Sequence, residues 1–371
     1  MSIRKTFGRF EDDERAAERD QHVAPESSCD QSRRQLITGA AALGLSSLLP
    51  NSDLFAAPRA KTILDFHLHW SGAPAPPGRG GGNTPGGRRA ENAQQVMEMM
   101  DEGGVLIGLL SNPGGGAGAA ADPAAAAKAA RAANDTMAKA VSDHPARFGM
   151  FANLPLPDVD AALKELDYAM GTLKANGVHL VSSYPGNLFL GDPKFDPLFQ
   201  ELNRRKIVVK THPSGNPCCT GLYANTGFDG GLVELGTDTM RAIGRLVFSG
   251  AAEKFPDVRI IWSHAGGSMV AFAQRFYGAI ENNPKLAEAV PKGPEYYLRR
   301  FYYDVAQAYH PVTLRALKTL VPMSQILFGT DFAFRTALQT IEGIEKSGVL
   351  NAQELRALGS GNGRKLLGLP A

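Results

Sequence analysis

The chain has 371 residues, of which 43% are hydrophobic and 20% are charged, and its formal net charge is +2. This composition is ordinary for a globular protein. The near balance of charge argues against nucleic-acid binding, and no apolar run is long enough for a stable membrane span of the mature chain. Cys218 and Cys219 are adjacent and Cys29 lies near the N-terminus, so the sequence contains neither a disulfide framework nor a cysteine-based zinc motif.

The first 60 residues differ from the rest of the chain. Residues 1–31 are charged and polar, and the run SRRQLITGAAALGLSSLLP then places Arg33 and Arg34 before a modest apolar stretch. This order over residues 32–57 resembles a twin-arginine export signal, which carries folded proteins across a bacterial inner membrane. We therefore expect residues 1–60 to be an export leader and disordered segment, and the mature protein to be periplasmic or exported. The alternative is a disordered tail with a chance arginine pair, which would leave the protein in the cytoplasm.

From residue 61 onward, short runs rich in apolar, β-branched and aromatic residues alternate with helical patterns. The strand candidates are 62–70, 105–111, 148–155, 177–183, 206–213, 258–266, 301–306 and 324–332. The helical patterns are 91–102, 123–143, 158–174, 194–204, 232–254, 267–282, 311–320 and 334–347. This alternation predicts parallel strands joined by crossover helices. We therefore predict an α/β fold, a single-domain (β/α)8 TIM barrel over residues 61–371.

Polar residues occur where several of these strands end. The run ILDFHLHW places His67 and His69 two residues apart, and alternate residues of a strand point to the same face. His212, His264 and Asp331 end three later strands, in KTHPSG, WSHAGG and FGTDF. Taken singly, Asp331 could cap a helix and His212 could bond to the backbone. In a barrel, however, these strand ends meet at one rim, and imidazole and carboxylate groups suit a borderline divalent ion such as Zn²⁺.

Three other histidines and one lysine have ordinary interpretations. His179 lies inside the fourth predicted strand, which indicates a satisfied core residue or one that faces a helix. His144 is expected at a helix C-terminus, and His310 in a surface loop. Lys210 precedes His212 by two residues and shares its face, so we expect it to be paired in the core or next to the metal ligands.

Several motifs together resemble a known family. The H-x-H pair, THPSG, WSHAGG, YYDVA and ILFGTDF occur in the order found in the amidohydrolase-related family, over nearly all of residues 61–368. Within it they resemble the branch of non-oxidative decarboxylases typified by aminocarboxymuconate semialdehyde decarboxylase. The resemblance implies one metal ion, usually zinc, with His264 close to it, where it transfers a proton or polarises bound water. The ligands that it implies are His67, His69, His212 and Asp331.

The same resemblance implies a metal-dependent decarboxylase, a carbon–carbon lyase acting on a small aromatic or unsaturated carboxylic acid, with His264 or Asp331 as the acid. A metal-dependent hydrolase that opens a lactone or a cyclic amide uses the same ligands and is the alternative. A barrel with a vestigial metal is the non-enzymatic alternative. The strand-four run GVHLVSS lacks the lysine that bridges two metals in other branches, which favours a single ion.

The resemblance also carries expectations about the substrate pocket and the assembly. In this branch, an arginine at the position of Arg275 reaches a neighbouring subunit's pocket and binds the substrate carboxylate, which implies a homodimer; the alternative is a solvated arginine on a surface helix. The Gly/Pro-rich loop 71–90 and the segment 214–231 are expected to wall the pocket. Arg79, Arg88 and Arg89 lie in the first of these loops, where they either hold a carboxylate or face water.

The export interpretation predicts the effect of a conservative change. Replacing both Arg33 and Arg34 with lysine keeps the charge but removes the arginine pair, so the protein should accumulate in the cytoplasm. Cell fractionation followed by immunoblotting measures this. Periplasmic delivery of the double variant at the wild-type level would contradict the prediction, as would the absence of wild-type protein outside the cytoplasm.

Overall fold

The computed structural model describes residues 59–70, 72, 90–114, 122–214 and 231–370, all within one compact unit, Ala57–Ala371. The proposed export leader lies outside the described residues, apart from its last two positions. Most of loop 71–90, including Arg79, Arg88 and Arg89, and residues 215–230 also lie outside them. The expectations for these segments remain predictions.

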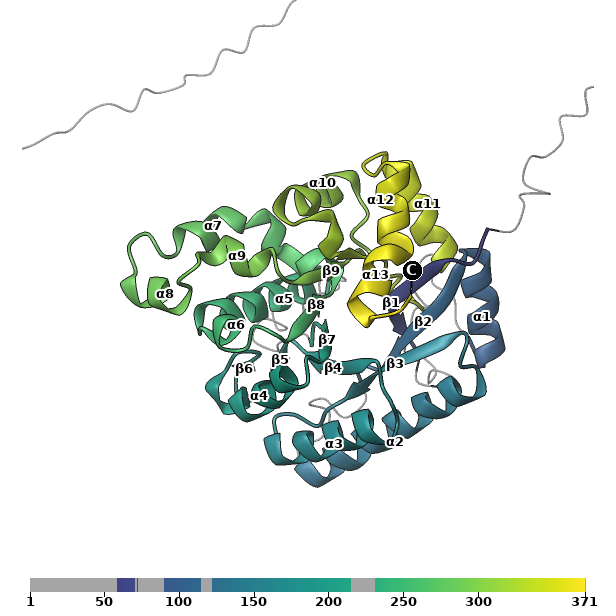
Figure 1. The fold of residues 1–371 in the computed structure, drawn as a ribbon, viewed down its shortest axis with the longest axis horizontal. Helices are drawn as coiled ribbons and strands as arrows, with labels where there is room; N and C mark the ends of the chain where they lie inside the picture. Colours follow the sequence, from purple (N-terminus) through teal and green to yellow (C-terminus); the bar gives the residue numbers. More distant parts are fainter. Residues whose placement is uncertain (1–58, 71, 73–89, 115–121, 215–230, 371) are drawn as a thin grey trace, which may run out of the picture. The chain divides into compact units, whose positions relative to one another are not determined.

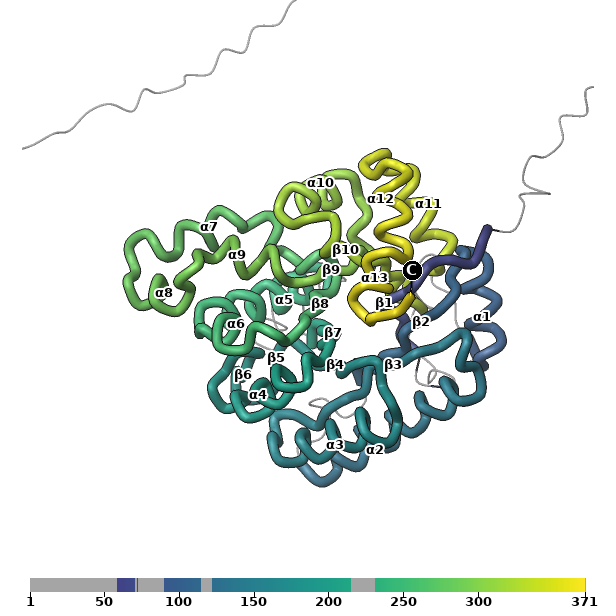
Figure 2. Tube along the Cα trace, viewed as in Figure 1, coloured from purple at the N-terminus to yellow at the C-terminus, as the bar shows by residue number. Residues whose placement is uncertain are grey.

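Eight parallel strands form the central sheet of the described part, in the order in which the predicted strands follow one another (Figure 1). They are β1 (Ile63–His69), β2 (Val105–Ser111), β3 (Phe148–Asn153), β4 (Gly177–Val181), β7 (Val208–His212), β8 (Arg259–Trp262), β9 (Tyr302–Asp304) and β10 (Ile326–Leu327). Each predicted strand is therefore present, although β8, β9 and β10 are markedly shorter than predicted. Figure 2 follows the chain around this ring from β1 to β10.

A seam between the chain segment after β10 and strand β1 closes the ring. The amide of Phe66 donates to the carbonyl of Phe328 at 3.0 Å, and that of His69 to Phe332 at 2.8 Å. At the same seam, the buried carboxylate of Asp65 accepts hydrogen bonds from the amide of Thr330 at 3.1 Å and from its hydroxyl at 2.7 Å. The predicted (β/α)8 barrel is confirmed.

Helices surround the strands (Figure 1). The long ones are α1 (Ala93–Glu102), α2 (Pro123–Asp143), α3 (Val159–Gly171), α4 (Asp196–Arg204), α5 (Gly231–Phe248), α10 (Pro311–Leu320) and α11 (Ala337–Ser347). Their starts follow from their caps: Asp122 and Asp158 accept amide hydrogen bonds ahead of α2 and α3, and Thr336 and Gln339 form a capping box on α11. Short helices complete the layer: α6 (Ala251–Lys254), α7 (Ala273–Gly278), α8 (Pro284–Ala289), α9 (Pro294–Leu298), α12 (Ala352–Arg356) and α13 (Asn362–Leu367).

Two predicted helices are interrupted. The pattern over 232–254 is split into α5 and α6 at Gly250, whose φ of +80° is open to glycine but strained for other residues. The pattern over 267–282 becomes the end of the 3₁₀ segment η4 (His264–Ala271) followed by α7, with non-helical backbone at Gly267, whose φ is +62°, and at Phe272 between the two. The hairpin of β5 (Ser183–Tyr184) and β6 (Leu188–Phe189) was not predicted.

The barrel interior has an apolar floor. Phe66, Leu109, Phe151, Val208 and Ile261 project from five strands into one cluster, and Leu366 of α13 packs against it. Gly363 allows this helix to approach, since a Cβ there would lie 2.4 Å from the ring of Phe66. The described side chains fill this floor, so we expect a ligand site at the opposite end, where the strands end.

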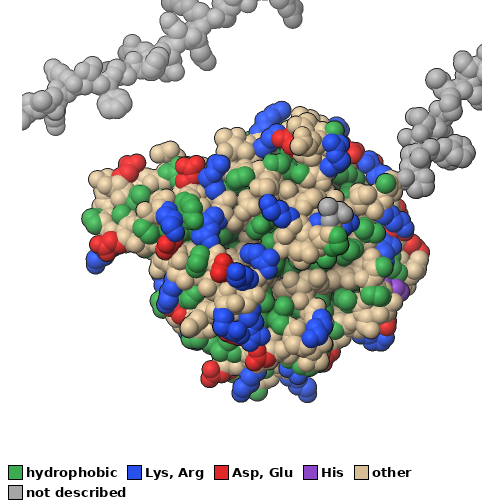
Figure 3. All heavy atoms as spheres, viewed as in Figure 1, with side chains coloured by type: hydrophobic (Ala, Val, Ile, Leu, Met, Phe, Trp, Pro, Cys, Tyr) green, Lys and Arg blue, Asp and Glu red, His purple; other side chains and the backbone are tan. Residues whose placement is uncertain are grey.

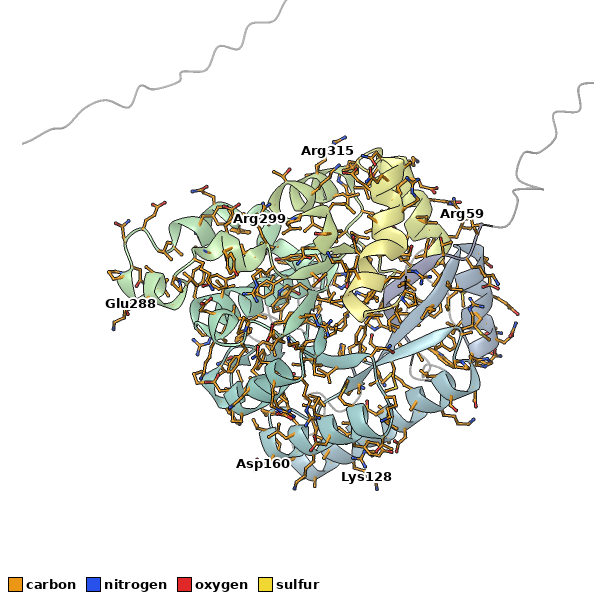
Figure 4. The ribbon with its side chains drawn as sticks, viewed as in Figure 1. Arg59, Lys128, Asp160, Glu288, Arg299 and Arg315 are labelled. Carbon is orange, nitrogen blue, oxygen red and sulfur yellow. The ribbon has the colours of Figure 1, made fainter. Side chains whose placement is uncertain are left out.

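The outer surface carries charge of both signs, spread over the face shown in Figure 3. Lys128, Asp160 and Glu288 extend outward from α2, α3 and α8 (Figure 4). None of the described helices combines the length and the apolarity needed to cross a membrane.

Candidate metal centre

His67 and His69 both face the barrel interior from the end of β1. His67 is fully buried and His69 is mostly buried, and their Nε2 atoms are 2.9 Å apart. His212 arrives from the end of β7, and its ring centre is 4.7 Å from that of His69. Asp331, in the left-handed region at φ +63°, places Oδ1 3.2 Å from His67 Nε2 and 3.0 Å from His69 Nε2. One ligand atom from each of the four residues lies within 4.8 Å of the other three.

The other ring nitrogen of each histidine is already bound, which determines the tautomers. His67 Nδ1 lies 3.0 Å from the carboxylate of Asp304, and His212 Nδ1 lies 2.8 Å from the carbonyl of Pro213. Both partners only accept, so both Nδ1 atoms carry the proton. The Ser111 hydroxyl donates to the Leu68 carbonyl at 3.5 Å and therefore accepts from His69 Nδ1, 3.3 Å away. All three Nε2 atoms thus present lone pairs.

These Nε2 atoms and the carboxylate of Asp331 lie within 4.8 Å of one another. Burial lowers the pKa of His69 to about 4 and that of His212 well below its ordinary value, so both rings are neutral at pH 7. Burial alone would raise the pKa of Asp331, but the histidines beside it hold the pKa well below the usual range. Burial and Lys210 work to lower the pKa of His67, but Asp304 and Asp331 outweigh them and raise it. Three imidazoles and one carboxylate at this spacing fit a single divalent cation, which would take the place of any proton on His67 Nε2.

A buried carboxylate, Asp304 at the end of β9, supports the ligands. Its Oδ2 accepts from His67 and, at 2.7 Å, from the ammonium of Lys210. Its Oδ1 accepts the amides of His264 at 3.0 Å and Ala306 at 3.1 Å. Burial works to raise the pKa of Asp304, but Lys210 and His67 outweigh it and hold the pKa far below its ordinary value. The predicted pairing of Lys210 in the core is confirmed.

His264 lies beside the four ligands without being one of them. Its ring centre is 4.8 Å from that of His67 and 5.8 Å from that of His212. Nδ1 donates to the carbonyl of Ala306 at 2.9 Å, which leaves Nε2 as an acceptor. Burial lowers the pKa of His264, so the neutral form prevails at pH 7. The side-chain amide of Gln307 donates to Asp331 Oδ2 and orients that carboxylate.

A second carboxylate supports the turn that follows His212. Asp238 on α5 is fully buried and accepts the amide of Ser214 at 2.9 Å and the hydroxyl of Ser183 at 2.8 Å. Because Ser214 follows His212 by two residues, this helix holds the end of β7 to the end of β4.

The structure thus gathers all four predicted ligands and His264 at one barrel rim, whereas Arg275 lies elsewhere. Arg275 is exposed on α7, and its guanidinium lies 6.0 Å from the ring centre of Phe272. Sequence reasoning missed Asp304, although it stands at a strand end in YYDVA as Asp331 does in FGTDF. Its place at the end of a predicted strand was the signal that could have identified Asp304.

The interpretation of His179 was wrong in part. It is buried, as expected, but neither ring nitrogen has a hydrogen-bond partner among the described residues, and its ring centre lies 6.2 Å from that of His212. It faces the barrel interior and not a helix. His144 does end a helix, α2, and the exposed His310 caps α10 by accepting the Val312 amide at 3.3 Å.

Comparison with known proteins gives consistent matches. A family model described as "Amidohydrolase" matches residues 64–369. The 6-methylsalicylic acid decarboxylase of Penicillium expansum is 36% identical over 205 residues, which are 55% of this chain and 63% of that protein. The 2-amino-3-carboxymuconate-6-semialdehyde decarboxylase of Dictyostelium discoideum is 27% identical over 252 residues, which are 65% of this chain and 66% of that protein. The chain therefore spans less than two thirds of the length of each relative.

A solved structure shares the fold. The dihydroxybenzoic acid decarboxylase from Polaromonas sp. JS666, with bound manganese and the inhibitor 2-nitroresorcinol, superimposes with a TM-score of 0.73 at 23% identity. The match covers 84% of this chain and 97% of the other.

The site geometry predicts which variants lose metal. His67→Ala, His69→Ala and Asp331→Ala each remove one converging ligand and should lose most of the bound metal, whereas His264→Ala should keep it. Asp304→Asn should weaken metal binding about 10–100-fold, since partners that orient ligands have effects of this size. Elemental analysis of the purified proteins measures this, with Asp160→Asn on the surface as the control. Loss of metal from His264→Ala, or its retention in the His67 and His69 variants, would refute the assignment.

Proposed function

The chain belongs to the amidohydrolase family, and we propose that it is a metal-dependent carboxy-lyase that releases CO₂ from a small aromatic carboxylic acid. The observation that carries the proposal is the ligand set for one ion with the free Nε2 of His264 beside it. The names of the relatives, a 6-methylsalicylic acid decarboxylase among them, support the reaction and the class of acid.

The reaction breaks one carbon–carbon bond. Its electron pair stays on the ring carbon, which then takes a proton. A bound divalent ion would supply a Lewis acid that holds the substrate's oxygens and withdraws electron density. Nδ1 of His264 donates to the carbonyl of Ala306, which leaves Nε2 as the acceptor. Nε2 can therefore accept a proton from an ionisable hydroxyl of the substrate and then donate that proton to the ring carbon. Asp331 is the second candidate for proton transfer.

We propose zinc as the ion, because three imidazoles and one carboxylate form a ligand set typical of zinc. Manganese is the alternative, since a structural relative contains it. Elemental analysis, followed by reconstitution of metal-free protein with either ion, distinguishes the two.

Activity is the direct test. Purified protein of known metal content should release CO₂ from ortho-hydroxylated benzoic acids, and His264→Ala should lower kcat by about 10²–10⁴-fold, the usual contribution of general acid–base catalysis. Headspace CO₂ measurement with mass-spectrometric product detection follows the reaction. Hydrolysis of lactones or cyclic amides without CO₂ release from any acid would replace this proposal with the hydrolase.

We also propose a homodimer in which Arg275 of one subunit completes the other subunit's site. The planar guanidinium suits a carboxylate, and Arg275 is exposed beside Phe272, whose exposed fraction is 41%. Leu232 on α5 and Val312 on α10 are exposed to 74% and 68%, and both helices pack against η4, which ends next to Phe272. Exposed apolar side chains on neighbouring elements are typical of an interface.

A subunit-mixing experiment tests this arrangement. Arg275→Ala and His264→Ala should each be nearly inactive alone, but a mixed dimer contains one site that has both wild-type residues. Each mixed dimer should therefore have about half of the wild-type activity. Random pairing of a 1:1 mixture makes about half of the dimers mixed, so the mixture should regain about a quarter of the wild-type activity. Arg356→Ala, an exposed arginine on α12, serves as the control and should remain active. No recovery in mixed dimers verified by mass spectrometry would exclude a shared site.

A further inference from the structure

Two buried polar side chains inside the barrel have no hydrogen-bond partner among the described residues. Asn153 ends β3 with an exposed fraction of 0%, and both its amide nitrogen and its amide oxygen are unpaired. His179 on β4 is 1% exposed, and both its ring nitrogens are unpaired. Buried polar groups are normally paired, because an unpaired group loses its hydration without compensation.

The strand register aims both side chains at the metal centre. Asn153 pairs with His179 between β3 and β4, and His179 pairs with Lys210 between β4 and β7. Register partners in a parallel sheet project on the same side. Lys210 reaches Asp304 and His67 within the barrel, so the whole row faces the interior. The ring of His179 lies next to the ring of the ligand His212.

The side chains of Asn153 and His179 do not stabilise the fold through hydrogen bonds to the described residues. The neighbouring Asn134 contacts the backbone of Asn153 and not its side-chain amide. It donates to the carbonyl of Asn153 at 2.9 Å and accepts from the backbone amide of Asn153 at 2.8 Å. The side chain of Asn134 also reaches Glu165, at 2.7 Å, and so it has a structural task. The amide of Asn153 and the imidazole of His179 remain available to a ligand.

The chemistry of the pair selects the group that it binds. A carboxamide has donors and an acceptor, and a neutral imidazole has one of each. A carboxylate can use only the donors of the pair, whereas a hydroxyl can accept from one of the two side chains and donate to the other. We propose that Asn153 and His179 bind a ring hydroxyl of the aromatic acid, distinct from the oxygens at the metal, and thereby select a substrate with a second hydroxyl. This inference rests on the proposed function.

Substrate discrimination tests the proposal. The wild type should have a higher kcat/KM for at least one of the 2,3-, 2,4-, 2,5- and 2,6-dihydroxybenzoates than for 2-hydroxybenzoate, which shares the metal-binding oxygens. Asn153→Leu and His179→Leu should each lower kcat/KM for the preferred dihydroxybenzoate about tenfold, a typical cost of one hydrogen bond, and leave 2-hydroxybenzoate nearly unchanged. Both variants should keep their metal, and their Tm should equal or exceed that of the wild type, because an unpaired buried polar group is removed.

Asn134→Leu is the matched control. It should lower Tm, since it breaks three buried hydrogen bonds, but leave the ratio of the two kcat/KM values unchanged. Equal losses of kcat/KM on all acids in the Asn153 and His179 variants would overturn the proposal. A lower Tm with unchanged discrimination would also overturn it, and would indicate that the two side chains bind an enclosed water. Calorimetric binding of the same acids separates the hydroxyl site from the proposed lyase function. If no CO₂ forms, the lyase function is refuted. A higher affinity for the dihydroxybenzoate that is lost in both the Asn153 and the His179 variant would still support the hydroxyl site.

Discussion

The site depends on one buried carboxylate. Asp304 is bound by the ammonium of Lys210, by the ring of His67 and by the amides of His264 and Ala306. Burying this charge is costly, and the cost is offset only because every lone pair is used and a cation lies beside it. The consequence is geometric: the same group orients His67 and anchors the turn that carries His264, the residue that we propose for proton transfer. The metal-ligating group and the proposed proton-transfer residue therefore share one support.

Below this network, the side chains inside the barrel change from polar to apolar within a single layer. The floor contains Phe66, Phe151 and Ile261, and the next inward-facing positions along the same strands are polar, as with Asn153 after Phe151 and Ser263 after Ile261. The apolar floor excludes water from beneath and lowers the local dielectric, which strengthens the electrostatic interactions of the layer above. Two polar side chains of the layer above the floor, Asn153 and His179, have no hydrogen-bond partner within the described protein, and these are the ones that we assign to the substrate.

The strands and the strand-end candidates could be predicted because they depend on local sequence, whereas the separation of His264 from the four ligands came from the family resemblance. Apolar runs mark the strands, and the strand order of a barrel brings His67 and Asp331 together without further information. The side that His179 faces could not be predicted, since a period of two separates the faces of a strand without saying which is inside. That answer needs the pairing with Lys210. The break at Gly250 and the left-handed turn at His264 were missed for a similar reason, because apolar periodicity continues through both.

The seam between the first and last strands has a consequence for how the ion is acquired. Asp65 and Thr330, which clamp that seam, are 265 residues apart, and the ligands His67 and Asp331 lie immediately beside them. During synthesis the first two ligands emerge early, but the carboxylate ligand arrives only when nearly the whole barrel has been translated. Only the completed ring therefore brings all the ligands together, and an ion bound there would hold the first and last strands of the barrel to each other.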